Sequence, residues 1–458
     1  MMCHSAPGRR WADRPFVAVL LTWVGWASLL VLLSPGLATA EDPTPIPHDF
    51  SKPDQVFAAT LSERFSNLGV AAHDLYLVLE AGDFVLLNRR PATREVPWLT
   101  TSGTLVNAPP ALVYQVVADV SHYHEFMPET KAASATPIVP GVVDRVDLEL
   151  SIQVLFTSIT NAYSLYYYYQ PPHRIDWVLA QGEFEANCGA FELVPVPGDP
   201  GRTILLHTSY ALPRNKILGS LFARVPDLDL MVNLTTGTMM MEAIKHRAET
   251  QHARTGGTVK PAAPPPDNLA HLVAQAGTLG RLARRGPLTL LGRTDPPWYT
   301  GILRVRRPRN QVFDTISHIE QAAVAIPYFQ AKVVEQSENG GRYEVESVIP
   351  LMIDFDAEYV MDATFAPPDQ VAWTAEAGGD LEGYQGTWKL IEQGAENTLV
   401  FYHTRSNLES LGFTMRKLLE MEPLFEHGIH VSEIQRIMAG IRRWAVASPE
   451  ERARLSSR

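Results

Sequence analysis

Two histidines are the polar residues of this sequence best placed to do chemistry. His207 and His403 each precede a threonine, lie 196 residues apart, and are predicted to occupy the same strand position in two copies of one module. An imidazole titrates near neutral pH, so it can serve as an acid, a base or a hydrogen-bonding group. The alternative is a structural histidine that bonds to an adjacent loop, because neither residue has an acidic or nucleophilic partner that the sequence identifies.

A run of tyrosines supplies further hydroxyl groups. Tyr166 to Tyr169 follows Tyr163, and a strand through these residues directs Tyr163, Tyr167 and Tyr169 to one side. On that side a phenol can offer its hydroxyl to a ligand while its ring stays in apolar surroundings, but core packing of a β-favouring aromatic run predicts the same pattern. The same two interpretations apply to Trp177, Phe191, Trp373 and Trp388.

The sequence lacks the signatures of several common enzyme classes. HExxH, GxSxG, Walker A and CxxC motifs are absent, which favours a binding module over a catalyst. The two cysteines, Cys3 and Cys188, allow neither a disulfide framework nor a multi-cysteine metal site in a mature chain without Cys3. Cys188 is expected to be a small buried residue. We therefore predict no catalytic residue, no metal and no cofactor.

The charge balance restricts the partners. The net charge is −11 over 458 residues, and an acidic protein is poorly suited to nucleic acid, whose phosphates require a basic surface. One local reversal is a group of arginines suited either to contact with anionic membrane head groups or a carrier protein, or to protection of a strand edge. Its members are Arg281, Arg284, Arg285, Arg293, Arg304, Arg306, Arg307 and Arg309.

Residues 1–40 have the three parts of a secretory signal peptide. Basic residues precede an apolar run from Phe16 to Leu33, and Ala38-Thr39-Ala40 provides the small residues that a signal peptidase accepts. We predict cleavage after Ala40 and an exported protein, periplasmic or secreted. An uncleaved N-terminal membrane anchor is the alternative, since the apolar run is long enough to just span a bilayer.

The rest of the chain contains one module twice. Pro109 and Pro308 are 199 residues apart, and so are Pro128 and Pro327. A spacing that survives over several landmarks indicates a repeat. We predict a first domain over residues 41–250, a linker rich in Pro, Gly and Ala over 251–268, and a second domain over 269–458.

Each copy has the same predicted order of elements. A strand is followed by a short helix that a proline opens, then by a meander of alternating strands, and finally by a long helical region with one apolar face. Strict alternation, as at Val146, Leu148 and Leu150, predicts an antiparallel sheet with one wet face. The long helix must bury its apolar face against the concave side of that sheet, which is an α+β architecture.

These elements resemble the START-like (SRPBCC) helix-grip superfamily, which includes polyketide cyclase/dehydrase-type, coenzyme-Q-binding and lipid-transfer proteins. The residues that carry the resemblance are Ala108-Pro109-Pro110, Asp119, Tyr123, Phe126 and Pro128. The second copy departs from them, with Arg307-Pro308-Arg309 and with His318 where Asp119 stands. The resemblance implies two tandem helix-grip domains, each an antiparallel sheet wrapped around a long C-terminal helix with an apolar tunnel between them.

We therefore predict an exported protein that holds a hydrophobic ligand such as a lipid, quinone or sterol-like molecule, and transfer of this ligand is a second role open to it. The alternative is a cyclase/aromatase-type enzyme acting on a polyketide-like substrate, against which the signal peptide counts. A third hypothesis is that one copy has lost its cavity and serves as a scaffold. The residues predicted to line the pockets are Leu148, Leu150, Tyr163, Tyr167, Trp177, Phe191, His207, Phe355, Tyr359, Met361, Trp373, Trp388 and His403.

Overall fold

The computed structural model describes nine segments of the chain: residues 68–88, 99–154, 157–182, 184–213, 228–259, 268–294, 296–349, 355–421 and 425–456. The predicted signal peptide lies outside these residues, and so do residues 260–267 of the predicted linker. Among the helices in the described segments, none combines the length and apolar character that crossing a bilayer requires.

The first repeat begins with a helix and a strand, α3 (Ala72–Ala81) and β1 (Gly82–Asn88). Next come β2 (Leu99–Val106), α4 (Pro110–Ala118), η2 (Val120–His122) and α5 (Tyr123–Phe126). Six strands form the meander: β3 (Thr130–Val139), β4 (Val143–Val154), β5 (Thr157–Gln170), β6 (Arg174–Gly182), β7 (Phe184–Val196) and β8 (Asp199–Pro213). The long helix α7 (Leu228–Arg254) closes the repeat and extends four residues into the segment predicted to be a linker.

The second repeat follows the same order. It opens with α8 (Asn268–Ala274), α9 (Ala276–Leu282), β9 (Leu288–Gly292), β10 (Tyr299–Val305), α10 (Arg309–Ser317), α11 (Ile319–Ala322) and η3 (Ala323–Ala325). The meander consists of β11 (Phe329–Ser337), β12 (Gly340–Ile349), β13 (Phe355–Ala366), β14 (Gln370–Ala375), β15 (Gln385–Glu392) and β16 (Thr398–Arg405). The chain then forms η4 (Leu408–Leu411), α12 (Phe413–Met421), α13 (Phe425–Val446) and α14 (Pro449–Ser456).

Local sequence explains where these elements begin and which way they face. Pro109 and Pro308 each occupy the N-cap position of the first helix after a strand, where a missing N–H costs nothing. In β13, Phe355, Ala357 and Tyr359 are buried while the residues between them are exposed, as the alternating pattern predicts. These features confirm the predicted antiparallel sheet and the predicted helices.

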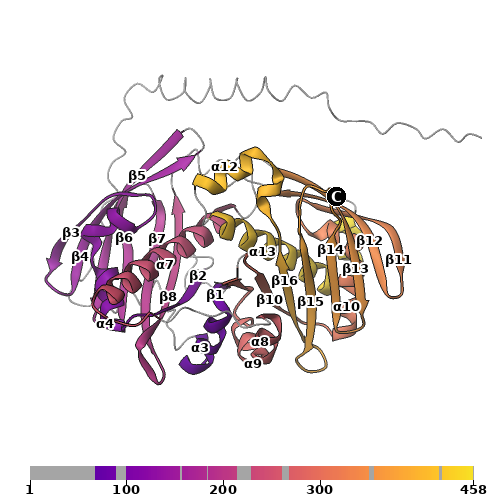
Figure 1. Ribbon diagram of the computed structural model, residues 1–458, viewed down its shortest axis with the longest axis horizontal. Helices are drawn as coiled ribbons and strands as arrows, with labels where there is room; N and C mark the ends of the chain where they lie inside the picture. Colours follow the sequence, from indigo (N-terminus) through magenta and orange to yellow (C-terminus); the bar gives the residue numbers. More distant parts are fainter. Residues whose placement is uncertain are drawn as a thin grey trace, which may run out of the picture. The chain divides into compact units, whose positions relative to one another are not determined.

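Within each repeat the strands form one antiparallel sheet with the long helix lying on it. The first repeat has the order β1-β2-β8-β7-β6-β5-β4-β3, and the second has β9-β10-β16-β15-β14-β13-β12-β11. Helices α7 and α13 lie across their sheets and contact each other (Figure 1). The predicted α+β fold of two helix-grip repeats is therefore confirmed.

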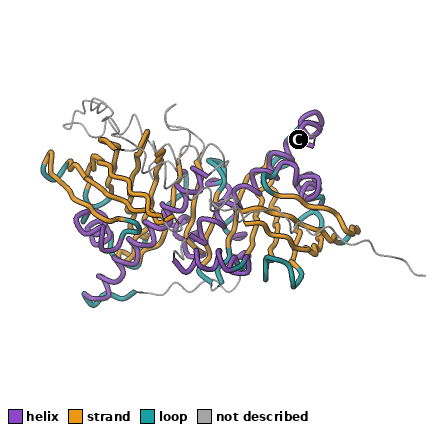
Figure 2. Tube along the Cα trace, turned by 90° about the horizontal axis from the view of Figure 1, so that it is seen from above, coloured by secondary structure: helices purple, strands orange, loops and turns teal. Residues whose placement is uncertain are grey.

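The two sheets are joined into one. Strand β1 pairs with β9 in antiparallel register, from Gly82 opposite Gly292 to Leu86 opposite Leu288, so all sixteen strands are continuous. The view in Figure 2 shows this run of strands with helices packed against it. This pairing is not predictable from the sequence, because a repeat pattern contains no information about which edge strands meet.

A shared hydrophobic core covers this junction on the face of the sheet opposite α7 and α13. Helix α3 of the first repeat packs beside α8 and α9 of the second. Buried residues from both repeats form one cluster, including Leu75, Leu79, Phe84, Leu86 and Leu206 from the first and Leu272, Leu279, Leu290, Ile302 and Phe401 from the second. Because each repeat completes the other's core, we infer that the two unfold together.

A substitution in this shared core tests the inference. Phe401 on β16 has no solvent-exposed surface, so Phe401→Ala should destabilise the protein by about 3 to 5 kcal/mol. Urea unfolding followed by circular dichroism should show one transition, and hydrogen exchange should accelerate in both repeats. Val334→Ala on β11 is the matched control, because Val334 is 50% exposed and its truncation should change little. Acceleration confined to the second repeat would contradict the shared core.

Candidate ligand-binding interior of the two repeats

The face of the sheet that α4, α7, α10 and α13 cover is called the inner face below. In the first repeat, Trp177 on β6 lies opposite Gly189 on β7, while Phe191 lies opposite His207 and His207 opposite Ser102. Directly paired strand residues point to the same face, so these side chains share the inner face. They bring three of the predicted pocket residues together.

Aromatic contacts hold this group in place. Trp177 stacks on His207 with ring centroids 5.4 Å apart, and Phe191 lies 5.1 Å from Trp177 and 5.0 Å from His207. A Cβ atom at Gly189 would lie 1.9 Å from the indole, so only glycine lets the ring cross β7 at this height. The indole Nε1 of Trp177 donates to Asn187 Oδ1 at 3.1 Å. Tyr167, 6.1 Å from Trp177, extends the aromatic group.

His207 lies in this apolar group without a polar partner. Its side chain is 2% exposed, and neither Nδ1 nor Nε2 has a hydrogen-bond partner among the described residues. The Oγ of Ser102, on the neighbouring strand, is likewise buried without a partner in that part of the chain. Burial lowers the pKa of His207 to about 4, so the imidazole is neutral at physiological pH. An unsatisfied buried polar group costs about 1 to 3 kcal/mol, which makes both groups candidates for ligand contacts.

The second repeat has a corresponding aromatic group. Trp373 stacks on Tyr402 at 5.2 Å, and Trp388 lies 4.2 Å from the same ring. Gly386 sits opposite Trp373, as Gly189 does opposite Trp177. The Trp373 Nε1, buried in this group, has no hydrogen-bond partner within the described segments.

Buried phenols supply the other polar atoms of this group. The hydroxyls of Tyr384 and Tyr402 are 2.7 Å apart, and the ring of Tyr359 lies 5.3 Å from that of Tyr384. Burial, reinforced by the neighbouring phenol, raises the pKa of Tyr384 well above its ordinary value. The phenols therefore remain neutral and are available as hydrogen-bonding groups at physiological pH.

A small cavity of about 30 Å³ lies within this aromatic group, between the sheet and α10, α11 and α13. Four of the predicted pocket residues line it: Tyr359, Met361, Trp373 and Trp388. Such a volume accommodates little more than water. A larger ligand could therefore enter the second repeat only if the lining side chains moved apart.

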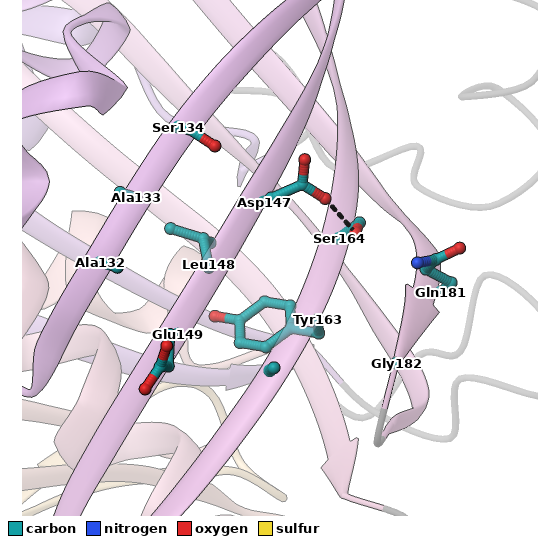
Figure 3. Close-up of a pocket in the computed structure, with 11 residues that line it drawn as sticks. Ala132, Ala133, Ser134, Asp147, Leu148, Glu149, Tyr163, Ser164, Gln181 and Gly182 are labelled. Atoms are coloured by element: carbon teal, nitrogen blue, oxygen red, sulfur yellow. Dashed lines mark hydrogen bonds between the residues drawn. The ribbon is translucent and has the colours of Figure 1, made fainter. Parts of the chain in front are cut away.

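A larger open hollow of about 360 Å³ lies on strands β3 to β6 of the first repeat. Leu148 and Tyr163 are the two predicted pocket residues that line it (Figure 3). The same close-up shows Asp147 turned toward Ser164 and hydrogen-bonded to it. Arg145 donates to both, at 3.0 Å from each, so the charged groups of this hollow are already paired.

The structure corrects the prediction for His403. Tyr402 lines the inner cavity, and adjacent strand residues point to opposite faces, so His403 points away from the cavity. There its Nδ1 is 2.7 Å from Thr300 Oγ1, and its ring stacks on Trp298 at 4.2 Å. The predicted equivalence with His207 is wrong by one residue. His207 follows Phe191 by 16 residues, whereas Tyr402 follows Trp388 by 14, because the hairpins between these positions differ in length.

Two other predicted residues have less direct roles. Phe355 belongs to the buried core of the second repeat but does not line the 30 Å³ cavity, and Leu150 lies half-buried on β4. Sequence reasoning missed Tyr384 and Tyr402. Aligning the two copies on the glycines opposite the tryptophans would have pointed to Tyr384, because it precedes Gly386 by two residues as Asn187 precedes Gly189.

Several of the clustered arginines form ion pairs within the protein. Arg281 lies 2.8 Å from Asp74, Arg293 lies 2.7 Å from Asp83, and Arg309 lies 2.5 Å from Asp369. The first two pairs cross the junction between the repeats. Three of the clustered arginines therefore have acidic partners within the protein. Contact of the cluster with a membrane stays a prediction. No cluster of His, Cys, Asp and Glu in the described segments is arranged to hold a metal ion.

Comparison with known proteins places this geometry in a class. Residues 106–235 match the family model described as "Polyketide cyclase / dehydrase and lipid transport". The match extends from the end of β2 into α7 and confirms the predicted resemblance for the first repeat. The second repeat has the same order of elements, so both repeats have the same helix-grip architecture. None of the curated proteins matches the chain.

The solved structures with a detectable likeness include proteins whose titles name them aromatase/cyclases and one whose title names it a lipid transfer protein. A di-domain ARO/CYC from the steffimycin biosynthetic pathway is 14% identical, with 75% of this chain and 99% of that chain covered and a TM-score of 0.26. An aromatase/cyclase from Streptomyces sp. R1128 is 21% identical, covering 35% and 98%, with a TM-score of 0.29. A STAR-related lipid transfer protein from Xanthomonas axonopodis is 13% identical, covering 36% and 93%, with a TM-score of 0.26. Likeness at this level says nothing about the ligand or reaction of this chain.

The neutral state of His207 predicts how stability depends on pH. Its pKa of about 4 in the folded protein lies below the ordinary value of 6.5, so protonation favours unfolding. The contribution of neutral His207 to the free energy of unfolding is complete above about pH 6.5. As the pH falls from there toward 4, this free energy decreases by up to about 3 kcal/mol. Urea unfolding at pH 7.5 and pH 4.5 should show a smaller difference for His207→Phe than for the natural chain. Equal differences in the two proteins would show that His207 is not buried in its neutral form.

Proposed function

We propose that this chain is an exported binding protein that holds a hydrophobic ligand, such as a lipid, quinone or sterol-like molecule, inside its helix-grip repeats. One observation carries the proposal. In each repeat, an aromatic interior contains buried polar atoms with no partner among the described residues: both ring nitrogens of His207 in the first and the indole Nε1 of Trp373 in the second. An apolar interior with a few unpaired polar groups is the usual composition of a small-molecule site.

The energetics favour an apolar ligand. The residues around these polar atoms are aromatic and aliphatic, and each Å² of apolar surface withdrawn from water contributes about 25 cal/mol. The polar atoms would set the orientation of the ligand, because each gains a hydrogen bond only when an acceptor or donor reaches it. The lowered pKa of His207 makes its imidazole a weak base and the raised pKa of Tyr384 makes its phenol a weak acid, so both suit hydrogen bonding better than proton transfer, which favours binding over the cyclase/aromatase alternative.

Native mass spectrometry tests the binding function. The full chain, expressed with its N-terminal segment in a Gram-negative bacterium and purified from the periplasmic fraction, should carry a mass addition that organic extraction releases. The extracted molecule should be apolar, because the interior that holds it is. The absence of any mass addition, together with no saturable quenching of tryptophan fluorescence by decyl-ubiquinone or dehydroergosterol, would contradict the proposal. Conversion of an added polyketide-like substrate would favour the enzyme instead.

Fractionation of the same cells tests export. The N-terminal 40 residues contain a basic start, an apolar run and a small-residue cleavage motif, so the mature chain should begin at Glu41 and appear in the periplasmic fraction. A variant that lacks residues 1–40 is the control and should remain in the cytoplasm. Intact full-length protein in the membrane fraction would favour the uncleaved anchor, and intact protein in the cytoplasm would contradict export.

A further inference from the structure

The two repeats differ at the centre of their aromatic groups. By strand register, His207 of the first repeat corresponds to Tyr402 of the second, and Ser102 corresponds to Gly301. In the second repeat the Tyr402 hydroxyl is paired with that of Tyr384, and Gly301 contributes no polar side chain. The first repeat instead keeps a hydroxyl and an imidazole side by side, both unpaired among the described residues.

The long helices α7 and α13 pack differently against these positions. A Cβ atom at Gly301 would lie 2.2 Å from the sulfur of Met438 and 2.4 Å from a methyl group of Ile434, so α13 fills this space with apolar side chains. In the first repeat, the residue of α7 that lies against Ser102 and His207 is Gly237. A Cβ atom at Gly237 would lie 3.3 Å from His207 Nδ1 and 3.3 Å from Ser102 Oγ. Both polar atoms therefore lie close to the backbone of a helix residue that has no side chain, and a methyl group at Gly237 would be in tight contact with each of them.

The hydroxyl of Ser102 and the imidazole of His207 determine which ligand group can bind here. Ser102 Oγ can donate or accept a hydrogen bond, and a neutral imidazole has one donor and one acceptor nitrogen. Neither group forms a hydrogen bond with a charged side chain among the described residues. Trp177 and Phe191 form apolar walls beside the imidazole. A carboxylate or phosphate brought here would be an unpaired buried charge, whereas an uncharged hydroxyl or carbonyl group would be satisfied.

We propose that His207 and Ser102 form a polar subsite in the first repeat that hydrogen-bonds one uncharged hydroxyl or carbonyl group of an apolar ligand beside Gly237. This inference rests on the proposed function and makes it more specific: the ligand is a neutral alcohol or a quinone-like carbonyl compound, and its polar end is bound in the first repeat. The second repeat, whose corresponding positions are filled or paired, does not bind that group.

Three variants of the full chain test the subsite. Gly237→Ala places a methyl group in tight contact with both polar atoms, His207→Phe keeps the aromatic stack but removes the ring nitrogens, and Ser102→Ala removes the hydroxyl. The Kd values of dehydroergosterol, which carries a hydroxyl, and decyl-ubiquinone, which carries carbonyls, are measured by tryptophan quenching. For whichever probe the natural chain binds, each variant should raise the Kd about tenfold, and laurate should bind the natural chain at least tenfold more weakly.

Two controls separate loss of binding from loss of fold. Gly277→Ala on α9 is the matched glycine control, because no atom lies within 4 Å of a Cβ placed there, and its Kd should equal that of the natural chain. A folding readout that does not depend on ligand, thermal unfolding by circular dichroism, should show Ser102→Ala and His207→Phe folded at the assay temperature. The imidazole nitrogen resonances of His207 should shift when the probe is added to the natural chain.

The outcomes distinguish this inference from the proposed function. If the natural chain binds neither neutral probe, both fail. If it binds a neutral probe but the folded His207→Phe and Ser102→Ala variants bind that probe equally well, or laurate binds as tightly, the subsite is overturned while the binding function stands. A crystal structure of the probe complex with only a water molecule between His207 and Ser102 would also overturn the subsite.

Discussion

The antiparallel pairing of β1 with β9 is the interaction on which the rest of the structure depends. Each sheet would otherwise end in an open edge strand at this point, which is a liability for any sheet protein. The pairing turns two edges into interior strands, and α3, α8 and α9 then bury one common core against both repeats. The long helices meet on the other face. The repeats therefore share one sheet and one core while each keeps its own interior.

In this arrangement each repeat keeps its own hydrophobic interior between its sheet and its long helix. In both repeats a tryptophan lies across a glycine of the neighbouring strand, which keeps the aromatic group at the same height beneath the long helix. What differs is the polar content of that group. In the first repeat an imidazole and a hydroxyl lie against Gly237. In the corresponding region of the second repeat, two phenols are hydrogen-bonded to each other and Met438 packs closely against Gly301. The two repeats therefore share one scaffold and differ in the polar groups of their interiors.

Much of the fold could be predicted because it follows from local pattern. The 199-residue spacing of Pro109 and Pro308 marked the repeat, and the alternation along β4 and β13 marked antiparallel sheet. The candidate site was predicted only in part. Trp177, Phe191 and His207 do lie together, whereas His403 lies on the opposite face of the sheet. The match of His207 with His403 is offset by one residue from the structural correspondence of His207 with Tyr402, and an offset of one residue along a strand puts the side chain on the opposite face.

The sequence by itself determined the repeat, the order of elements in each copy and the apolar faces, because periodicity and turn residues act within a few residues of the chain. Tertiary structure alone decided that β1 joins β9, that Ser102 faces His207 under Gly237, and that Met438 fills the corresponding space in the second repeat. These are contacts between segments far apart in the chain. Their partners are selected by strand register and helix packing, which no local pattern encodes.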